Sequence, residues 1–264
     1  MRPKIRAVLI AALIILVLIS FAWLLGPANA REEAPEAPAS MRYIIHAGGV
    51  IDGNTNTNSL EAIQNAYDQG NRVIEIDFNI TNDGCLVCTH DWGLYRETGL
   101  DLDGFLAYDR YEGLTSMTAD DLAEFLREKP DLFIVTDVKE NNLTAIQRLR
   151  DSYPDLTRQF IVQIYSEEEY SPVREMGFQH IIYTLYNCTW DYVMDTDHLI
   201  AFAQENELFG YTYSAELWDV EGYTEKMLAA GVSLFVHTVN DPETQQYFFD
   251  LGITGIYTDN TIHQ

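Results

Sequence analysis

The chain has 264 residues, 47% of them hydrophobic, and a formal net charge of −25 at pH 7. This length and composition suit one globular domain with a full core. A charge this negative repels nucleic acid and anionic membrane surfaces. We therefore expect neither to be a partner of the folded domain. Any anionic substrate would need local cations to bind, and a divalent metal is their most direct source.

Residues 1–30 are predicted to lie outside the fold. Arg2, Lys4 and Arg6 precede an almost unbroken apolar run, Ala7 to Leu25, which as a helix would span roughly 28 Å, enough to cross a bilayer core. The pattern favours a single membrane anchor, with the rest of the chain outside the cytoplasm because the positive flank stays inside. The small residues Ala28-Asn29-Ala30 leave a second interpretation open, a signal peptide cleaved near Ala30 and a secreted protein.

The segment 31–41 is charged and rich in proline, which is typical of a flexible linker. From Arg42 onward, strand-like runs alternate with amphipathic helical stretches, so residues 42–264 are predicted to form one folded domain. We expect strands at Tyr43–Ala47, Val73–Phe78, Phe133–Val138, Phe160–Ile164, Ile181–Leu185, Phe209–Tyr213, Leu234–Thr238 and Gly255–Tyr257. We expect helices at Ser59–Gln69, Ala119–Glu128, Leu143–Ser152, Glu167–Met176, Thr196–Glu205, Val220–Ala230 and Asp241–Leu251. This alternation predicts an α/β fold, a (β/α)8 TIM-type barrel of somewhat irregular form.

One apolar run, Cys85–His90, breaks the alternation. It follows the second strand after only four residues, too few for the crossover that a parallel strand needs. Asp83-Gly84 is a strong turn signal. We therefore expect a β-hairpin after the second strand, which returns His90 to the neighbourhood of Glu75 and Asp77.

Polar residues collect where the predicted strands end, the edge at which barrels of this class place their active sites. His46 ends the first strand, Glu75 and Asp77 lie near the end of the second, and Asp137 and Lys139 repeat that spacing on the third. Three carboxylates on one rim suit Ca2+ or Mg2+. Two flanking histidines, His46 and His90, can act as general base and general acid. Each signal alone is also common in purely structural roles, but their joint placement favours a site.

The stretch from Ile45 to Trp92 (HAGG…NTNSLEA…VIEIDFNITNDGCLVCTHDW) resembles the glycerophosphodiester phosphodiesterase family. Further matches are Thr136-Asp137-Val138-Lys139, His237-Thr238-Val239-Asn240-Asp241 and Gly255-Ile256-Tyr257-Thr258-Asp259. The matches run in order through nearly all of residues 42–260. As an ordered set they are specific, although no single piece is.

The resemblance implies a metal-dependent hydrolase that cleaves a phosphodiester to an alcohol and a phosphomonoester, and the N-terminal pattern places it outside the cytoplasm. It implies His46 and His90 as the acid/base pair and Glu75, Asp77 and Asp137 as ligands of Ca2+ or Mg2+. A substrate hydroxyl activated by one histidine would attack phosphorus while the other histidine protonates the leaving alcohol. We expect substrate-binding residues at Lys139, which we also expect to stabilise developing charge, and at Asn58 and Gln163. The expected partner is a small-molecule or polymer phosphodiester, and no protein partner is inferred.

Several positions depart from the family pattern. Ala47 stands where Arg is common, Thr57 where Glu is common, and Asp137 where the family usually has the longer Glu. These changes suggest a divergent member with an altered head-group preference.

Two alternatives stay open. The first is a phospholipase of the sphingomyelinase D or phosphatidylinositol-cleaving kind, for which the apolar residues within Trp92–Met117 could form a membrane-facing rim. Acidic residues in the same segment would oppose an anionic bilayer, which favours a lid or substrate-shaping loop. The second is a catalytically inactive, membrane-tethered binding module, which the missing Arg suggests and the retained histidines and carboxylates oppose.

Overall fold

The computed structural model describes residues 37–91, 93, 101–108, 111–138, 140–215, 220 and 222–260. The predicted anchor or signal peptide, most of the linker, and Lys139 lie outside the described residues. Within the described part of the chain, no helix is both long and apolar enough to cross a membrane. The domain boundaries at residues 30 and 41 stay predictions.

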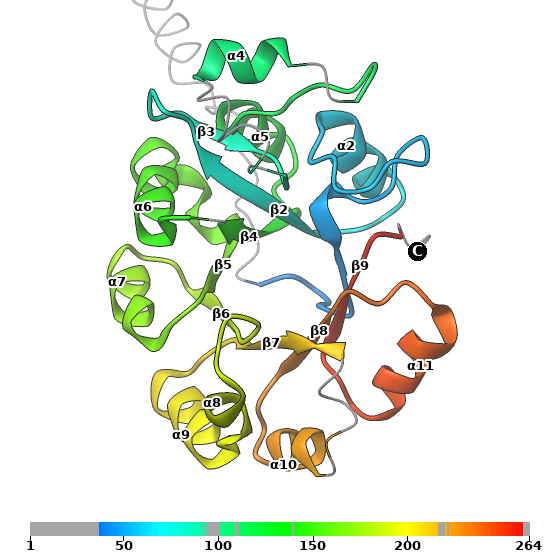
Figure 1. The fold of residues 1–264 in the computed structure, drawn as a ribbon, viewed down its shortest axis with the longest axis vertical. Coiled ribbons are helices and arrows are strands. Elements are labelled where there is room, and N and C mark those ends of the chain that lie inside the picture. The colour runs from blue at the N-terminus through cyan, green and yellow to red at the C-terminus, as the bar shows by residue number, and fades with distance from the viewer. Residues whose placement is uncertain are drawn as a thin grey trace, which may run out of the picture. The chain divides into compact units, whose positions relative to one another are not determined.

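Eight parallel strands of the described chain form a closed barrel, because β1 pairs with both β2 and β9 (Figure 1). They are β1 (Tyr43–Ile45), β2 (Val73–Ile80), β4 (Phe133–Val138), β5 (Phe160–Ile164), β6 (His180–Thr184), β7 (Gly210–Ser214), β8 (Leu234–His237) and β9 (Gly255–Thr258). Each strand lies beside its successor in the chain, apart from the inserted β3. The predicted TIM-type barrel is confirmed.

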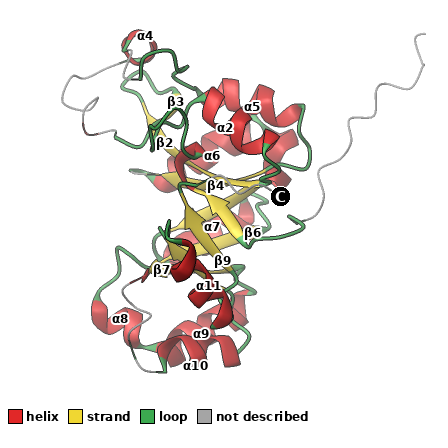
Figure 2. Ribbon diagram, turned by 90° about the vertical axis from the view of Figure 1, so that its right-hand side faces the viewer, coloured by secondary structure: helices red, strands yellow, loops and turns green. Residues whose placement is uncertain are grey.

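Helices surround the barrel (Figures 1 and 2). They are η1 (His46–Gly48), α2 (Leu60–Asp68), α4 (Leu102–Ala107), α5 (Ala119–Arg127), α6 (Asn142–Ser152), η2 (Pro154–Gln159), η3 (Glu167–Glu169), α7 (Tyr170–Glu175), α8 (Trp190–Met194), α9 (Thr196–Asn206), α10 (Tyr223–Ala229) and α11 (Pro242–Asp250). Side chains fix several starts: Ser59 accepts from Ala62 N, and Thr118 and Asp121 form a capping box. The predicted helices are present with shifted ends, while the short α4 and α8 were not predicted.

The predicted hairpin is confirmed. β3 (Leu86–Cys88) runs antiparallel to β2, with Phe78 opposite Cys88. Two further bonds hold the returning chain against β2, since Thr89 N donates to Asp77 O (3.0 Å) and Asn79 Nδ2 donates to Thr89 O (2.7 Å). His90 follows directly and is thereby delivered to the strand end that carries Asp77.

The barrel interior changes from apolar to polar along the strands. Alternate side chains share one face of a strand, and on β4 that face carries Phe133, Val135 and then Asp137. The lower layer is a buried apolar cluster of Met41, Ile44, Val73, Phe133, Val135, Ile161, Ile182, Phe235 and Tyr257. The same period places Glu75, Asp77 and Asp137 above it, so the strand pattern itself builds a polar layer at the carboxyl ends.

Gly255, the first residue of β9, lies against the backbone of Met41 and has no room for a side chain. A Cβ there would lie 1.9 Å from Met41 O and 3.1 Å from the Phe235 ring. We expect Gly255→Ala to lower the free energy of unfolding by about 1–3 kcal/mol, because backbone must shift to relieve the overlap. Gly93→Ala, whose Cβ would meet nothing within 4 Å, is the control. Equal thermal unfolding midpoints for the two variants would contradict the expectation.

Candidate active site

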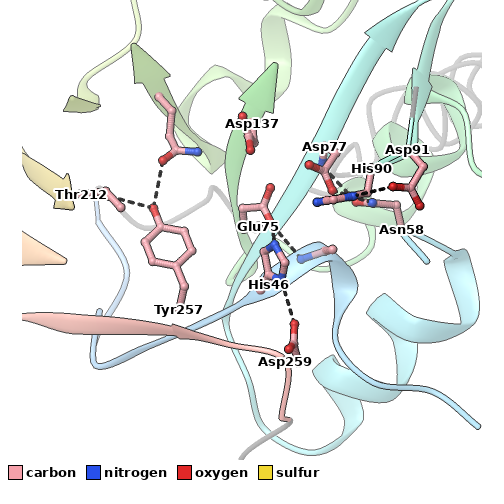
Figure 3. A network of polar contacts seen from close by, with 12 residues as sticks. His46, Asn58, Glu75, Asp77, His90, Asp91, Asp137, Thr212, Tyr257 and Asp259 are labelled. Atoms are coloured by element: carbon pink, nitrogen blue, oxygen red, sulfur yellow. Dashed lines mark hydrogen bonds and ion pairs between the residues drawn. The ribbon is translucent and has the colours of Figure 1, made fainter. Parts of the chain in front are cut away.

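Three carboxylates meet at the carboxyl ends of β2 and β4 (Figure 3). Asp77 and Asp137 are direct partners across the two strands, and Glu75 lies one pleat below Asp77 on the same face. Each of the three offers an oxygen within 4.8 Å of the others. Glu75 and Asp77 are almost wholly buried, and Asp137 is 9% exposed. Buried like charges at this spacing repel one another, so the cluster has the donor set of a cation site.

Backbone and amide groups hold two of these carboxylates in place. Asn58 Nδ2 donates to Asp77 Oδ2 (2.7 Å), and Asp77 N donates to Asn58 Oδ1 (3.0 Å). Ala47 N donates to Glu75 Oε2 (2.7 Å). Ala47 and Asn58 both have positive φ, 47° and 48°, an uncommon backbone state for residues other than glycine. This local strain aims Ala47 N and the Asn58 amide at the acidic layer.

His46 lies beside the cluster and is held by Asp259, which follows β9. The Nδ1 atom of His46 lies 2.7 Å from Asp259 Oδ1, and its Nε2 atom lies 3.9 Å from Glu75 Oε2. Asp259 is itself fixed by Asn240, whose Nδ2 donates to Asp259 Oδ2 (2.6 Å). Burial alone lowers the pKa of His46, but the bond to Asp259 and the charges of Glu75 and Asp77 outweigh it and raise the pKa to about 9.

His90 faces His46 across the mouth of the site. Their ring centroids are 6.0 Å apart and nearly perpendicular. The Nδ1 atom of His90 lies 3.1 Å from Asp91 Oδ1, so each histidine has a carboxylate at Nδ1 (Figure 3). With Nδ1 engaged as donor, the Nε2 atom of each ring is available for proton exchange with a substrate.

Asp137 is contacted by two tyrosines from the next strands. The hydroxyl of Tyr165, just after β5, donates to Asp137 Oδ1, and that of Tyr186, after β6, donates to the same oxygen at 3.3 Å. Burial, with the charge of Asp137 and the neighbouring Tyr186, raises the pKa of Tyr165 well above its ordinary value. Tyr165 therefore stays protonated and acts as the donor.

An open pocket lies over these groups. It is lined by His46, His90, Asp137, Val138, Glu140, Asn141, Asn142, Tyr165, Glu169, Tyr186, Asn187 and His237. A smaller, deeper pocket adjoins it, and Glu75 and Gln163 are among its lining residues. The predicted candidates His46, His90, Glu75, Asp77 and Asp137 are thus brought together, with Gln163 nearby.

Two predicted substrate-binding residues need separate comment. Asn58 is fully buried and engaged with Asp77 on both sides of its amide, a position that suits holding Asp77; its predicted contact with substrate stays a prediction. Lys139 lies outside the described residues. The site also contains residues whose roles the sequence did not predict, chiefly Asp259 and Tyr165.

The glycerophosphoryl diester phosphodiesterase family profile matches residues 51–210, which include Glu75, Asp77, His90 and Asp137. The chain belongs to this family. It is accordingly a phosphodiesterase, a phosphoric diester hydrolase, and the resemblance found in the sequence is confirmed.

Named relatives agree with this family assignment. The lysophospholipase D GDPD1 of Rattus norvegicus is 23% identical over 83% of this chain and 83% of its own length. A glycerophosphodiester phosphodiesterase from Galdieria sulphuraria superposes with a TM-score of 0.67 at 17% identity, covering 86% of this chain and 96% of that one. A phosphodiesterase of Oleispira antarctica, solved with the product sn-glycerol-3-phosphate, has a TM-score of 0.64 at 17% identity, covering 83% and 93%. At these identities the two structures establish the shared barrel.

The phosphodiesterase should show a specific pH dependence of stability in the presence of a chelator. A His46 pKa raised from 6.5 to about 9 stabilises the fold fully below pH 6.5 and loses that effect as pH rises through 9. Burial would raise the pKa of Asp259, but the bonds from His46 and Asn240 outweigh it and lower that pKa from 3.8. The ionised Asp259 therefore stabilises the fold above pH 3.8, and this stabilisation is lost as the pH falls below that value.

Asp259→Asn should therefore cost most stability between about pH 4 and 6.5, and the deficit should shrink toward pH 9. Unfolding midpoints of both proteins across this range, with an NMR titration of His46, provide the measurement. A deficit that is constant with pH would contradict the pairing.

Proposed function

We propose that this phosphodiesterase is extracytoplasmic and hydrolyses glycerophosphodiester-type substrates to an alcohol and a phosphomonoester, using a divalent metal and two histidines. The observation that carries the proposal is the convergence of three buried carboxylates and two facing histidines on one barrel rim. A histidine with a purely structural role would need neither a second histidine facing it nor a cluster of mutually repelling carboxylates beside it.

The residues present fit a hard divalent cation. Glu75, Asp77 and Asp137 would hold it, since carboxylate oxygens are the preferred ligands of both Ca2+ and Mg2+. When bound, the cation would offset the acidic charge, neutralise the phosphate and favour ionisation of the attacking oxygen. The cation would also offset the repulsion between a chain of charge −25 and its anionic substrate.

The chain's own groups would move the protons. One histidine takes the proton from the substrate hydroxyl next to the phosphate, and that oxygen attacks phosphorus. The bond to the leaving oxygen breaks, and the other histidine gives that oxygen its proton. This yields a free alcohol and a cyclic phosphate, which water opens to the phosphomonoester by the same exchange in reverse. Asp259 would hold the His46 ring in the orientation that this exchange needs.

The route makes a free hydroxyl beside the phosphate essential. We expect sn-glycero-3-phosphocholine to be hydrolysed and its 2-deoxy analogue to be inert, as followed by release of choline. Diacylated phosphatidylcholine has no such hydroxyl and should also be inert, whereas cleavage of a diacylated phospholipid would support the phospholipase alternative. Binding of these compounds without turnover of any of them would support the inactive binding module.

The described part of the 92–117 segment gives limited support to a lipid-facing rim. Leu106 and Tyr108, in and just after α4, are 50% and 45% exposed. Asp101 and Asp103 lie beside them at the start of the same helix. These carboxylates would oppose an anionic bilayer, so a role in shaping the substrate entrance is favoured.

The proposed location rests on the apolar run from Ala7 to Leu25 and its basic flank. An uncleaved anchor predicts that the full-length chain fractionates with membranes and that its barrel is digested by protease added to intact cells. Release of a chain beginning near Arg31 would support the secreted alternative. Protection from protease in intact cells would contradict both.

A further inference from the structure

Asp137 differs from the other two carboxylates in what holds it. Asp77 is fixed by an asparagine and Glu75 by a backbone amide, whereas Asp137 receives the hydroxyl of Tyr165. The same hydroxyl accepts a bond from Val138 N at 2.9 Å. The Tyr165 hydroxyl therefore bridges the carboxylate of Asp137 and the backbone N–H of Val138, the last two residues of β4.

A second group of bonds holds the backbone that carries Tyr165. Tyr165 N donates to Glu169 Oε2 (2.8 Å), and Asn142 Nδ2 donates to the same oxygen (2.9 Å). Asn142 Nδ2 also donates to Gln163 O at 3.0 Å, which ties the first residue of α6 to β5. These bonds hold the backbone at Gln163 and Tyr165, and the hydroxyl itself is held between Val138 N and Asp137 Oδ1.

We propose that Tyr165 is a positioning residue for the cation site, its hydroxyl making up for the shortness of Asp137 by holding that carboxylate in its ligating orientation. The assignment rests on the proposed metal site. The sequence resemblance implies a Glu at this position, and Asp is one methylene shorter. A carboxylate extended by that methylene would have to find room where the Tyr165 hydroxyl already makes contact.

Hydrogen bonds to ligating carboxylates set metal affinity, and losing such a partner typically lowers affinity about 10–100-fold. The bonds from Tyr165 and Tyr186 both fall on Oδ1 and so restrain rotation of the carboxylate. The Tyr186 bond is longer, and that residue is 44% exposed, so Tyr165 should contribute more.

The test is a calorimetric titration of the chelator-treated, full-length chain with Ca2+ and Mg2+. We expect Tyr165→Phe to bind about 10–100-fold more weakly than wild type, and hydrolysis to recover at correspondingly higher metal concentrations. Tyr211→Phe is the matched control, because its buried hydroxyl donates to Leu199 O (2.9 Å) on the barrel's outer side. It should keep wild-type affinity despite a comparable lost bond, which separates positioning from general stability.

A second pair of variants tests the compensation directly. Asp137→Glu alone should also weaken metal binding, and the double variant Asp137→Glu with Tyr165→Phe should bind more tightly than either single variant. Unchanged affinity in Tyr165→Phe, or a double variant no better than the singles, would overturn the assignment while the metal site stands. A wild-type chain that binds neither ion would overturn the proposed function and this assignment with it.

Discussion

Glu75→Gln is expected to lower the rate of phosphodiester hydrolysis about 10³-fold or more, since a metal supplies several kcal/mol of charge stabilisation in the transition state and each 1.4 kcal/mol is tenfold in rate. Glutamine keeps the shape and can still accept the bond from Ala47 N (2.7 Å), so the turn that carries His46 should persist. The substitution removes one of the three buried negative charges that are proposed to bind the cation. The measurement is the rate of choline release from sn-glycero-3-phosphocholine at fixed metal concentration.

Added metal is expected to stabilise the wild type, and the same variant should lose that stabilisation. A ligand present at about 100 times its dissociation constant stabilises the folded state by about 2.7 kcal/mol, which appears as a rise in the unfolding temperature. Glu61→Gln is the control: Glu61 is a carboxylate of α2 that accepts bonds from Thr115 and is not part of the acidic cluster. A Glu75→Gln protein that is still stabilised by metal and still active would contradict the proposed ligand set.

His46→Gln and His90→Gln are each expected to slow hydrolysis of an alkyl phosphodiester about 10²–10⁴-fold, the usual effect of removing a general acid or base. The ring centroids lie 6.0 Å apart, a spacing that would let each ring serve a different oxygen of the reacting phosphate. His198→Gln is the control, because His198, on α9, pairs with Glu167 of η3 and its side chain is 46% exposed.

A change of leaving group separates the two roles. A 4-nitrophenyl phosphodiester of glycerol releases an anion that needs no proton, so the variant lacking the general acid should approach the wild-type rate. The variant lacking the general base should stay slow. Wild-type rates on the alkyl substrate in both variants would contradict two-histidine catalysis.

The sequence predicted the barrel well where local pattern and tertiary packing agree. Phe133–Val138 and Phe160–Ile164 end where expected, because buried parallel strands are near-continuous apolar runs and their ends are marked by polar residues. The hairpin was predictable since four residues cannot carry a crossover. The short helices α4 and α8 were not, because five or six residues carry too little periodicity to be distinguished from loop.

The acidic cluster could be predicted because it depends on neighbouring strands and period-two spacing. The partners of the cluster could not. Asp259 reaches His46 only when the barrel closes β9 against β1, a contact between residues 213 apart in the chain. In the sequence, Tyr165 is one of several aromatic residues just beyond predicted strand ends, and its contact with Asp137 depends on the loop conformation that Glu169 and Asn142 fix. The Thr258-Asp259 match was the available signal for the first; nothing local marked the second.

The central claim is that the three carboxylates and two histidines form a metal-dependent phosphodiesterase site. Phosphorus-31 NMR of sn-glycero-3-phosphocholine incubated with the full-length chain in detergent tests it most directly, first after exhaustive chelation and then with Ca2+ or Mg2+ restored. We predict no turnover in the chelated sample and accumulation of a phosphomonoester after metal is restored. Undiminished turnover after complete metal removal, or none with either ion present, would contradict it.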